Sequence, residues 1–182
     1  MVRLYLVRHG KAAAAFSEAP NPGLDPSGVA QAEAMAERLE PLGPMPIITS
    51  PLTRARETAA SLEQRWRFTA RLLPAVGEIP SPMDDPAERG LWLREVMAGV
   101  WSKQADELQA WRRGVADALL ALERPTVVVT HLVAINAAVG IAEGDDRVIS
   151  FHPDNCSVTV LDVEDGALRL VRRGAARATP VL

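Results

Sequence analysis

Cysteine is almost absent from this sequence, in which Cys156 is the single example. A lone cysteine cannot form a disulfide within the chain, which excludes a small disulfide-stapled fold and fits a reducing compartment. We therefore expect a cytoplasmic protein. Cys156 precedes the β-prone run Ser-Val-Thr-Val, so we interpret it as a packed strand residue rather than as a reactive thiol.

Long hydrophobic runs are also lacking. The longest apolar stretch, residues 127–142, contains His131 and Asn136 and is shorter than the ~20 residues that a membrane span needs. The apolar run at the N-terminus stops at Arg8, which is too early for the hydrophobic region of a secretory signal. We expect no membrane association.

Positive charge is not in excess, since 20 Lys and Arg stand against 23 Asp and Glu, for a formal net charge of -3. A general nucleic-acid binder would show a basic excess, so we expect no nucleic-acid partner. The 182 residues suffice for one domain with an ample core, and we treat 1–182 as a single domain.

What the sequence does have is a chemically distinctive start. Val2 to Val7 is a short, mainly apolar run that predicts a buried strand, and it is followed directly by Arg8, His9 and Gly10. Open α/β sheets place their ligands at the carboxyl edge of the strands. An imidazole beside a permanent cation suits attack on a phosphoryl group, because arginine can grip phosphate oxygens with two parallel hydrogen bonds. An isolated Arg-His-Gly is common by chance, so the assignment needs partners elsewhere.

Three later segments supply these partners. Residues 125–130 predict a second buried strand, which ends at His131. Ser50 and Pro51 predict the N-cap and first position of a helix that holds Arg54 in its first turn, where the dipole disfavours a cation without an anionic partner. Glu78 lies in a proline-rich loop and is the carboxylate placed to act as general acid.

The remaining pattern alternates strands and helices, which predicts an α/β fold. Further helices are expected over 26–39, 86–100, 102–122 and 132–140, and further strands over 45–49, 68–73, 148–151, 157–163 and 167–172. Residues of about 80–124 form a helical insertion that is expected to cover the sheet edge. Its three tryptophans, Trp92, Trp101 and Trp111, are expected to pack in the core.

Taken together, these motifs resemble the histidine phosphatase superfamily, also called phosphoglycerate mutase-like, in its branch 1. The matching segments are Leu6-Val-Arg-His-Gly10, Thr49-Ser-Pro-Leu-Thr-Arg54, the loop around Glu78, Val128-Val-Thr-His131 and Asn155-Cys-Ser-Val-Thr-Val160. The resemblance implies a three-layer α/β/α sandwich with a mixed, mostly parallel central sheet. It implies that His9 is the nucleophile that forms a phosphohistidine, that Arg8, Arg54 and His131 bind the phosphoryl group, and that Glu78 is the general acid and base. It also implies that no metal or other cofactor is required and that the substrate is a small phosphorylated metabolite.

The chain also departs from the family. Mutases of the family usually carry Glu directly after Arg-His-Gly and an Asn a few residues on, whereas Lys11 and an alanine run stand here, which argues against mutase activity. Two alternatives stay open: a phosphatase acting on a phosphohistidine protein, and a phosphate-ester binding module without turnover. His152 matches no family motif and is expected to be a loop or rim histidine.

Overall fold

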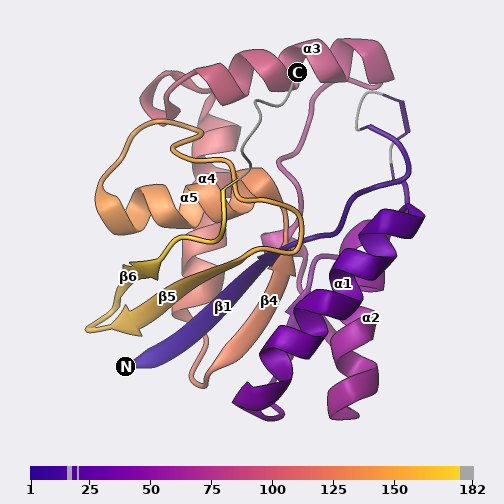
Figure 1. The fold of residues 1–182 in the computed structure, drawn as a ribbon. Helices are drawn as coiled ribbons and strands as arrows, with labels where there is room; N and C mark the ends of the chain where they lie inside the picture. Colours follow the sequence, from indigo (N-terminus) through magenta and orange to yellow (C-terminus); the bar gives the residue numbers. More distant parts are fainter. Residues whose placement is uncertain (16–17, 20, 177–182) are drawn as a thin grey trace.

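A six-stranded sheet forms the middle layer of the computed structural model, which describes residues 1–15, 18–19 and 21–176 (Figure 1). The strand order is β3-β2-β4-β1-β5-β6. The strands are β1 (Val2–Arg8), β2 (Ile47–Thr49), β3 (Arg71–Leu72), β4 (Thr126–Thr130), β5 (Val158–Glu164) and β6 (Ala167–Arg172). Strands β1 to β4 are mutually parallel, while β5 runs antiparallel to β1 and β6. The parallel strands therefore bring their carboxyl ends to one edge, as the sequence predicted.

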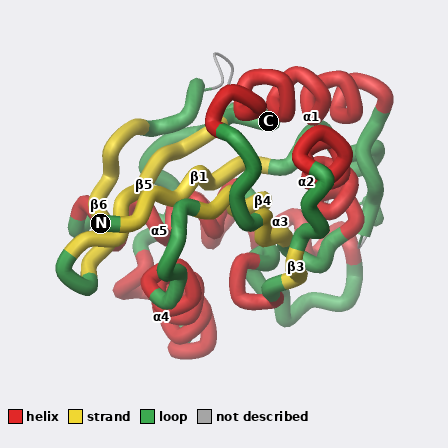
Figure 2. Tube along the Cα trace, turned by 90° about the horizontal axis from the view of Figure 1, so that it is seen from below, coloured by secondary structure: helices red, strands yellow, loops and turns green. Residues whose placement is uncertain are grey.

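Two helix pairs cover the two faces of this sheet (Figure 2). Helices α1 (Pro26–Leu39) and α2 (Thr53–Trp66) pack on one face, and α4 (Asp106–Leu120) and α5 (Leu132–Glu143) pack on the other. Alternation along β1 directs Leu4 and Leu6 to the core below α4 and α5, and Val7 to the core below α1 and α2. The predicted three-layer α/β/α sandwich with a mixed sheet is confirmed.

Helix α3 (Pro86–Ala98) lies beyond the carboxyl ends of β1 and β4, across one end of the molecule (Figure 1). Asp85 caps it by accepting hydrogen bonds from the N–H groups of Ala87 and Glu88. A short 3-10 turn (Trp101–Lys103) then leads toward α4. Trp101 is buried, and Trp92 and Trp111 pack against the same cluster, so the tryptophans do have the packing role expected of them.

The start of α2 differs from the prediction. The helix begins at Thr53, and its N-cap is Leu52 rather than Ser50. The Ser50 N–H instead donates to the Val129 carbonyl, which continues the pairing of β2 with β4, and the Ser50 hydroxyl lies 2.8 Å from His131 Nε2. Ser50 is thus engaged by the neighbouring strand and by a histidine, and the helix starts after it.

The strand predicted over 148–151 is also wrong. The segment is irregular, with bends at Val148 and Ser150, and the side chain of Asn136 takes the place of a neighbouring strand. Its Oδ1 accepts from the N–H groups of Ser150 and Phe151, and its Nδ2 donates to the Phe151 carbonyl. The hairpin between β5 and β6 does form as predicted, with Asp165 and Gly166 at positive φ.

Cys156 is buried in the core, as expected, but lies in the turn before β5 rather than within a strand. Burial raises the pKa of its thiol to about 12, which keeps it protonated and unreactive. None of the described helices combines the length and apolarity required to cross a bilayer.

Candidate active site

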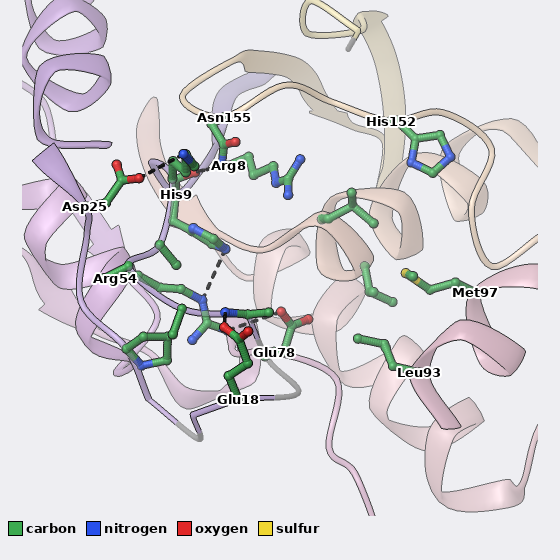
Figure 3. A pocket seen from close by; sticks show the side chains of 18 residues that line it. Arg8, His9, Glu18, Asp25, Arg54, Glu78, Leu93, Met97, His152 and Asn155 are labelled. Atoms are coloured by element: carbon green, nitrogen blue, oxygen red, sulfur yellow. Dashed lines mark hydrogen bonds and ion pairs between the residues drawn. The ribbon is translucent and has the colours of Figure 1, made fainter. Parts of the chain in front are cut away.

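The five residues singled out in the sequence meet at the carboxyl edge of the sheet. Arg8, His9, Arg54 and Glu78 line a pocket of about 520 Å³ there (Figure 3). His131 is fully buried beside it, with its ring centroid 5.1 Å from that of His9. The topology accounts for this meeting, because β1 ends at Arg8, β4 ends directly before His131, and α2 follows directly from β2.

The imidazole of His9 is fixed in one tautomer by its own backbone. Its Nδ1 lies 2.7 Å from the Gly10 carbonyl oxygen, which can only accept, so Nδ1 carries the proton and Nε2 keeps its lone pair. Burial, followed by the neighbouring His131 and the positive charge of Arg54, lowers the pKa of His9 well below 6.5. The ring is therefore neutral at pH 7 and has a nucleophilic nitrogen.

The backbone around His9 is held on three sides. The His9 N–H donates to the Thr130 carbonyl at 3.0 Å, and the His9 carbonyl accepts from Asn155 Nδ2 at 2.9 Å. The Gly10 N–H donates to Thr58 Oγ1 at 2.9 Å. The Thr58 hydroxyl in turn donates to the Arg54 carbonyl at 2.7 Å, which joins the strand end to the first turn of α2.

Glycine at two positions lets α1 approach this strand end closely. A Cβ on Gly10 would lie 2.6 Å from the Gly28 carbonyl oxygen, and a Cβ on Gly28 would overlap the backbone of Lys11. Only glycine fits such a contact without moving the backbone. The N-terminus of α1 and the segment after His9 therefore form one tightly packed unit.

The guanidinium groups give the site a positive character. Arg54 is 4% exposed; its Nε donates to His9 Nε2 at 3.2 Å and its Nη2 to Glu78 Oε2 at 3.3 Å, while its Nη1 is buried without a hydrogen-bond partner. Arg8 donates from Nη1 to the Pro153 carbonyl at 2.8 Å. Two guanidinium groups thus line the pocket beside Glu78, and a buried N–H without an acceptor is costly, so the arrangement favours an anionic ligand.

Glu78 and His131 complete the cluster. Glu78 Oε2 lies 3.4 Å from His131 Nδ1, without the geometry of a hydrogen bond, and Glu78 Oε1 accepts from the Ile79 N–H at 3.1 Å. His131 Nε2 is hydrogen-bonded to the Ser50 hydroxyl. Burial, followed by the charges of Arg54 and Arg8, lowers the pKa of His131 well below 6.5, so this ring is also neutral.

Some of the same side chains are of the types that bind metal ions. His9, Glu78 and His131 present potential ligand atoms within 4.8 Å of one another, a donor set of the kind that zinc accepts. However, Arg54 Nε faces the nucleophilic nitrogen of His9, and Arg8 lines the same pocket. A cation placed among these guanidinium groups would be repelled, so the electrostatics suit an anion better than a metal ion.

The sequence does not identify the side chains that hold the cluster in place, namely Ser50, Thr58 and Asn155. Their hydrogen-bond partners lie far away in the sequence, so these roles appear only in the folded structure. Lys11 is exposed, and its ammonium pairs with Asp25 at 3.0 Å, at the edge of the pocket. His152 is exposed on the pocket rim, as expected.

The chain is similar to known proteins in its family and in its fold. No curated protein sequence matches the chain significantly. A phosphoserine phosphatase from Entamoeba histolytica, solved with phosphoserine, superposes with a TM-score of 0.77 at 19% identity, over 96% of this chain and 98% of that one. The mycobacterial glucosyl-3-phosphoglycerate phosphatase superposes with a TM-score of 0.74 at 23% identity, over 97% of this chain and 100% of that one. At such identities the likeness establishes the fold. The family model of the histidine phosphatase superfamily (branch 1) matches residues 4–176, and the chain therefore belongs to that superfamily.

Proposed function

We propose that the protein is a phosphatase that hydrolyses a phosphomonoester through a phosphohistidine on His9. The observation that carries this proposal is the state of His9: a neutral imidazole with its Nδ1 proton tied to a carbonyl and its Nε2 facing the guanidinium of Arg54. A nucleophile held among phosphate-binding cations is the arrangement that phosphoryl transfer requires.

In the first step, His9 Nε2 attacks phosphorus and the bond from phosphorus to the ester oxygen breaks. Arg8, Arg54 and His131 hold the phosphoryl oxygens and stabilise the charge that shifts onto them. The protonated carboxyl of Glu78 gives its proton to the departing oxygen, which leaves as an alcohol. The position of Glu78 supports this role, because its Oε2 lies within 3.4 Å of both Arg54 Nη2 and His131 Nδ1.

In the second step, water attacks the phosphorus of the phosphohistidine. The carboxylate of Glu78 accepts a proton from that water, the phosphorus–nitrogen bond breaks, and the electron pair returns to His9 Nε2. Phosphate then leaves, and the enzyme is restored with its carboxyl protonated.

A small phosphorylated metabolite is the substrate class that we propose. A phosphoramidate substrate, such as a phosphohistidine protein, has little need of an acid, whereas Glu78 is positioned to supply one. The two structural neighbours described above carry names that refer to phosphoserine and to glucosyl-3-phosphoglycerate, which are small esters. We further propose that residues 1–182 act as one domain with a helical insertion over about 80–124, of which α3 borders the pocket, and that the reaction takes place in the cytoplasm.

Phosphate release by the wild type and by His9→Ala, over a panel of phosphomonoesters and a phosphohistidine peptide, tests the proposal. We expect at least one ester to be hydrolysed by the wild type and not by the variant, which should melt as cooperatively as the wild type. Turnover of the peptide alone would indicate a phosphohistidine phosphatase. Binding of esters without any turnover would indicate a binding module.

A further inference from the structure

The pocket extends well beyond the phosphoryl centre, and its outer wall is apolar. This wall comprises Ala12, Ala13, Ala14, Ala15, Leu93, Met97, Leu132 and Val133. Leu93 and Met97 are four residues apart on α3, so they share one face of that helix. Figure 3 shows them on the side of the pocket opposite Asp25 and Arg54. The leaving group of a bound ester would therefore meet mainly carbon atoms.

The described residues around this outer wall offer no cation that is available to a second anionic group. Among the described residues that line the pocket, Lys11 is the one lysine or arginine besides Arg8 and Arg54, and its ammonium is paired with Asp25 at 3.0 Å. Glu18 adds a carboxylate on the loop after the alanine run, where its Oε2 accepts from the Ala15 N–H at 2.9 Å. A leaving group that carried its own carboxylate would be desolvated against apolar side chains and would face Glu18.

We propose that the substrate is a phosphate monoester of an uncharged, largely apolar alcohol or phenol, whose carbon skeleton lies against Leu93 and Met97. The inference rests on the proposed phosphatase activity and specifies its substrate class. Arg8 and Arg54 are engaged at the phosphoryl end, so the outer wall selects by shape and apolarity. Phosphorylated carboxylic acids are poor substrates, because nothing in this wall compensates their second charge.

A matched pair of esters isolates the effect of charge. One ester, 4-carbamoylphenyl phosphate, carries an amide where the other, 4-carboxyphenyl phosphate, carries a carboxylate. The two esters have nearly the same shape and differ by one negative charge. Both esters are assayed under the same conditions at pH 8. We expect kcat/KM for the amide to exceed that for the carboxylate by about 10-fold or more. An equal or higher kcat/KM for the carboxylate would overturn the inference.

Variants of α3 test which surface makes the selection. Leu93→Ala and Met97→Ala should each lower kcat/KM for an uncharged aryl phosphate by about 10-fold. Inorganic phosphate occupies only the phosphoryl end of the pocket. Its inhibition constant in each variant should therefore stay within about twofold of the wild-type value. Leu91→Ala is the matched control, because Leu91 lies on the same helix, is 57% exposed and is outside the pocket lining. If Leu93→Ala and Met97→Ala behaved like this control, the assigned contacts would be wrong.

Charge reversal gives an independent check. Met97→Lys places a cation in the apolar wall and should shift the preference toward the carboxylated ester, and Glu18→Gln should narrow the preference for the amide. Unchanged preferences in both variants would contradict the proposal. Turnover that depends on His9 but favours the carboxylate would overturn this inference alone. The absence of turnover that depends on His9 would overturn the proposed function and, with it, the inference.

Discussion

Replacing Arg54 by methionine should weaken phosphate binding strongly without unfolding the protein. The guanidinium is 4% exposed, contacts His9 at 3.2 Å and Glu78 at 3.3 Å, and has a buried Nη1 without a partner. Methionine keeps an unbranched side chain in the same space and removes the charge. Because a buried N–H without an acceptor destabilises the folded state, Arg54→Met should lose little thermal stability.

The expected loss in affinity follows from the hydrogen bonds that the guanidinium can make. Two parallel bonds from Arg54 to phosphate oxygens are charge-assisted, and each contributes about 1.5–3 kcal/mol. Losing both costs about 3–6 kcal/mol, which corresponds to a 10²- to 10⁴-fold weaker dissociation constant for phosphate.

Calorimetric titration with inorganic phosphate measures this loss directly, and thermal denaturation gives a second readout. At a phosphate concentration about 100-fold above Kd, the wild type should gain about 2.7 kcal/mol of stability, or roughly 5–11 °C in Tm. Arg54→Met should gain no more than about 0.4 kcal/mol at the same concentration, because its Kd is at least 10²-fold higher. Arg56→Met, which removes an exposed arginine of the same helix, should keep the full shift. A phosphate Kd for Arg54→Met within about threefold of the wild-type value would show that Arg54 does not bind phosphate.

Three further predictions concern the acid, pH and packing. Glu78→Gln should slow hydrolysis of an alkyl phosphate by ~10²-fold or more, because the departing oxygen loses its proton donor, and should barely affect a phosphohistidine peptide; steady-state assays that showed equal losses would contradict the role of Glu78. The free energy of unfolding should fall as the pH drops below about 6.5, because the unfolded chain binds protons at His9 and His131 while burial keeps their pKa values in the folded state well below that. Between pH 7.5 and pH 5.5, the Tm of His131→Asn should fall by less than the Tm of the wild type. An equal fall in Tm would count against buried neutral imidazoles. Gly28→Ala should destabilise the fold by about 1–3 kcal/mol in urea denaturation, because the added Cβ would overlap backbone, whereas Gly114→Ala, with open space around it inside α4, should stabilise it by about 0.5–1 kcal/mol. A Gly28→Ala variant as stable as the wild type would show that the glycine contact is not needed.

The meeting of His9 and His131 was predictable from the sequence because it depends on local signals. Each histidine directly follows a short, mainly apolar segment that ends in one polar residue, Arg8 or Thr130, and such segments form buried strands. Once β1 and β4 are parallel neighbours, their carboxyl ends must lie together. The position of Arg54, in the first turn of the helix after β2, follows from the same logic.

The sequence could not show which distant side chains hold the site. Ser50 resembled a helix N-cap, but its hydroxyl is engaged by a histidine 81 residues away. Residues 148–151 resembled a strand, but the N–H groups of Ser150 and Phe151 donate to the side chain of Asn136 on α5. In α3 the apolar residues do not form one stripe, and only Val96 is buried, so the local pattern does not reveal that Leu93 and Met97 face the pocket. These three features depend on contacts between residues far apart in the sequence, which a local pattern does not show.

The proposed reaction depends on a covalent phosphohistidine on His9, and this intermediate can be trapped and located. The wild type is mixed with a ³²P-labelled aryl phosphate, quenched within milliseconds in alkaline detergent, and digested to locate the label. We expect label on the peptide that contains His9, stable to alkali and lost in acid as a phosphoramidate should be, and no label in His9→Ala. Label on another residue, or phosphate release by His9→Ala at the wild-type rate, would rule out a phosphohistidine on His9.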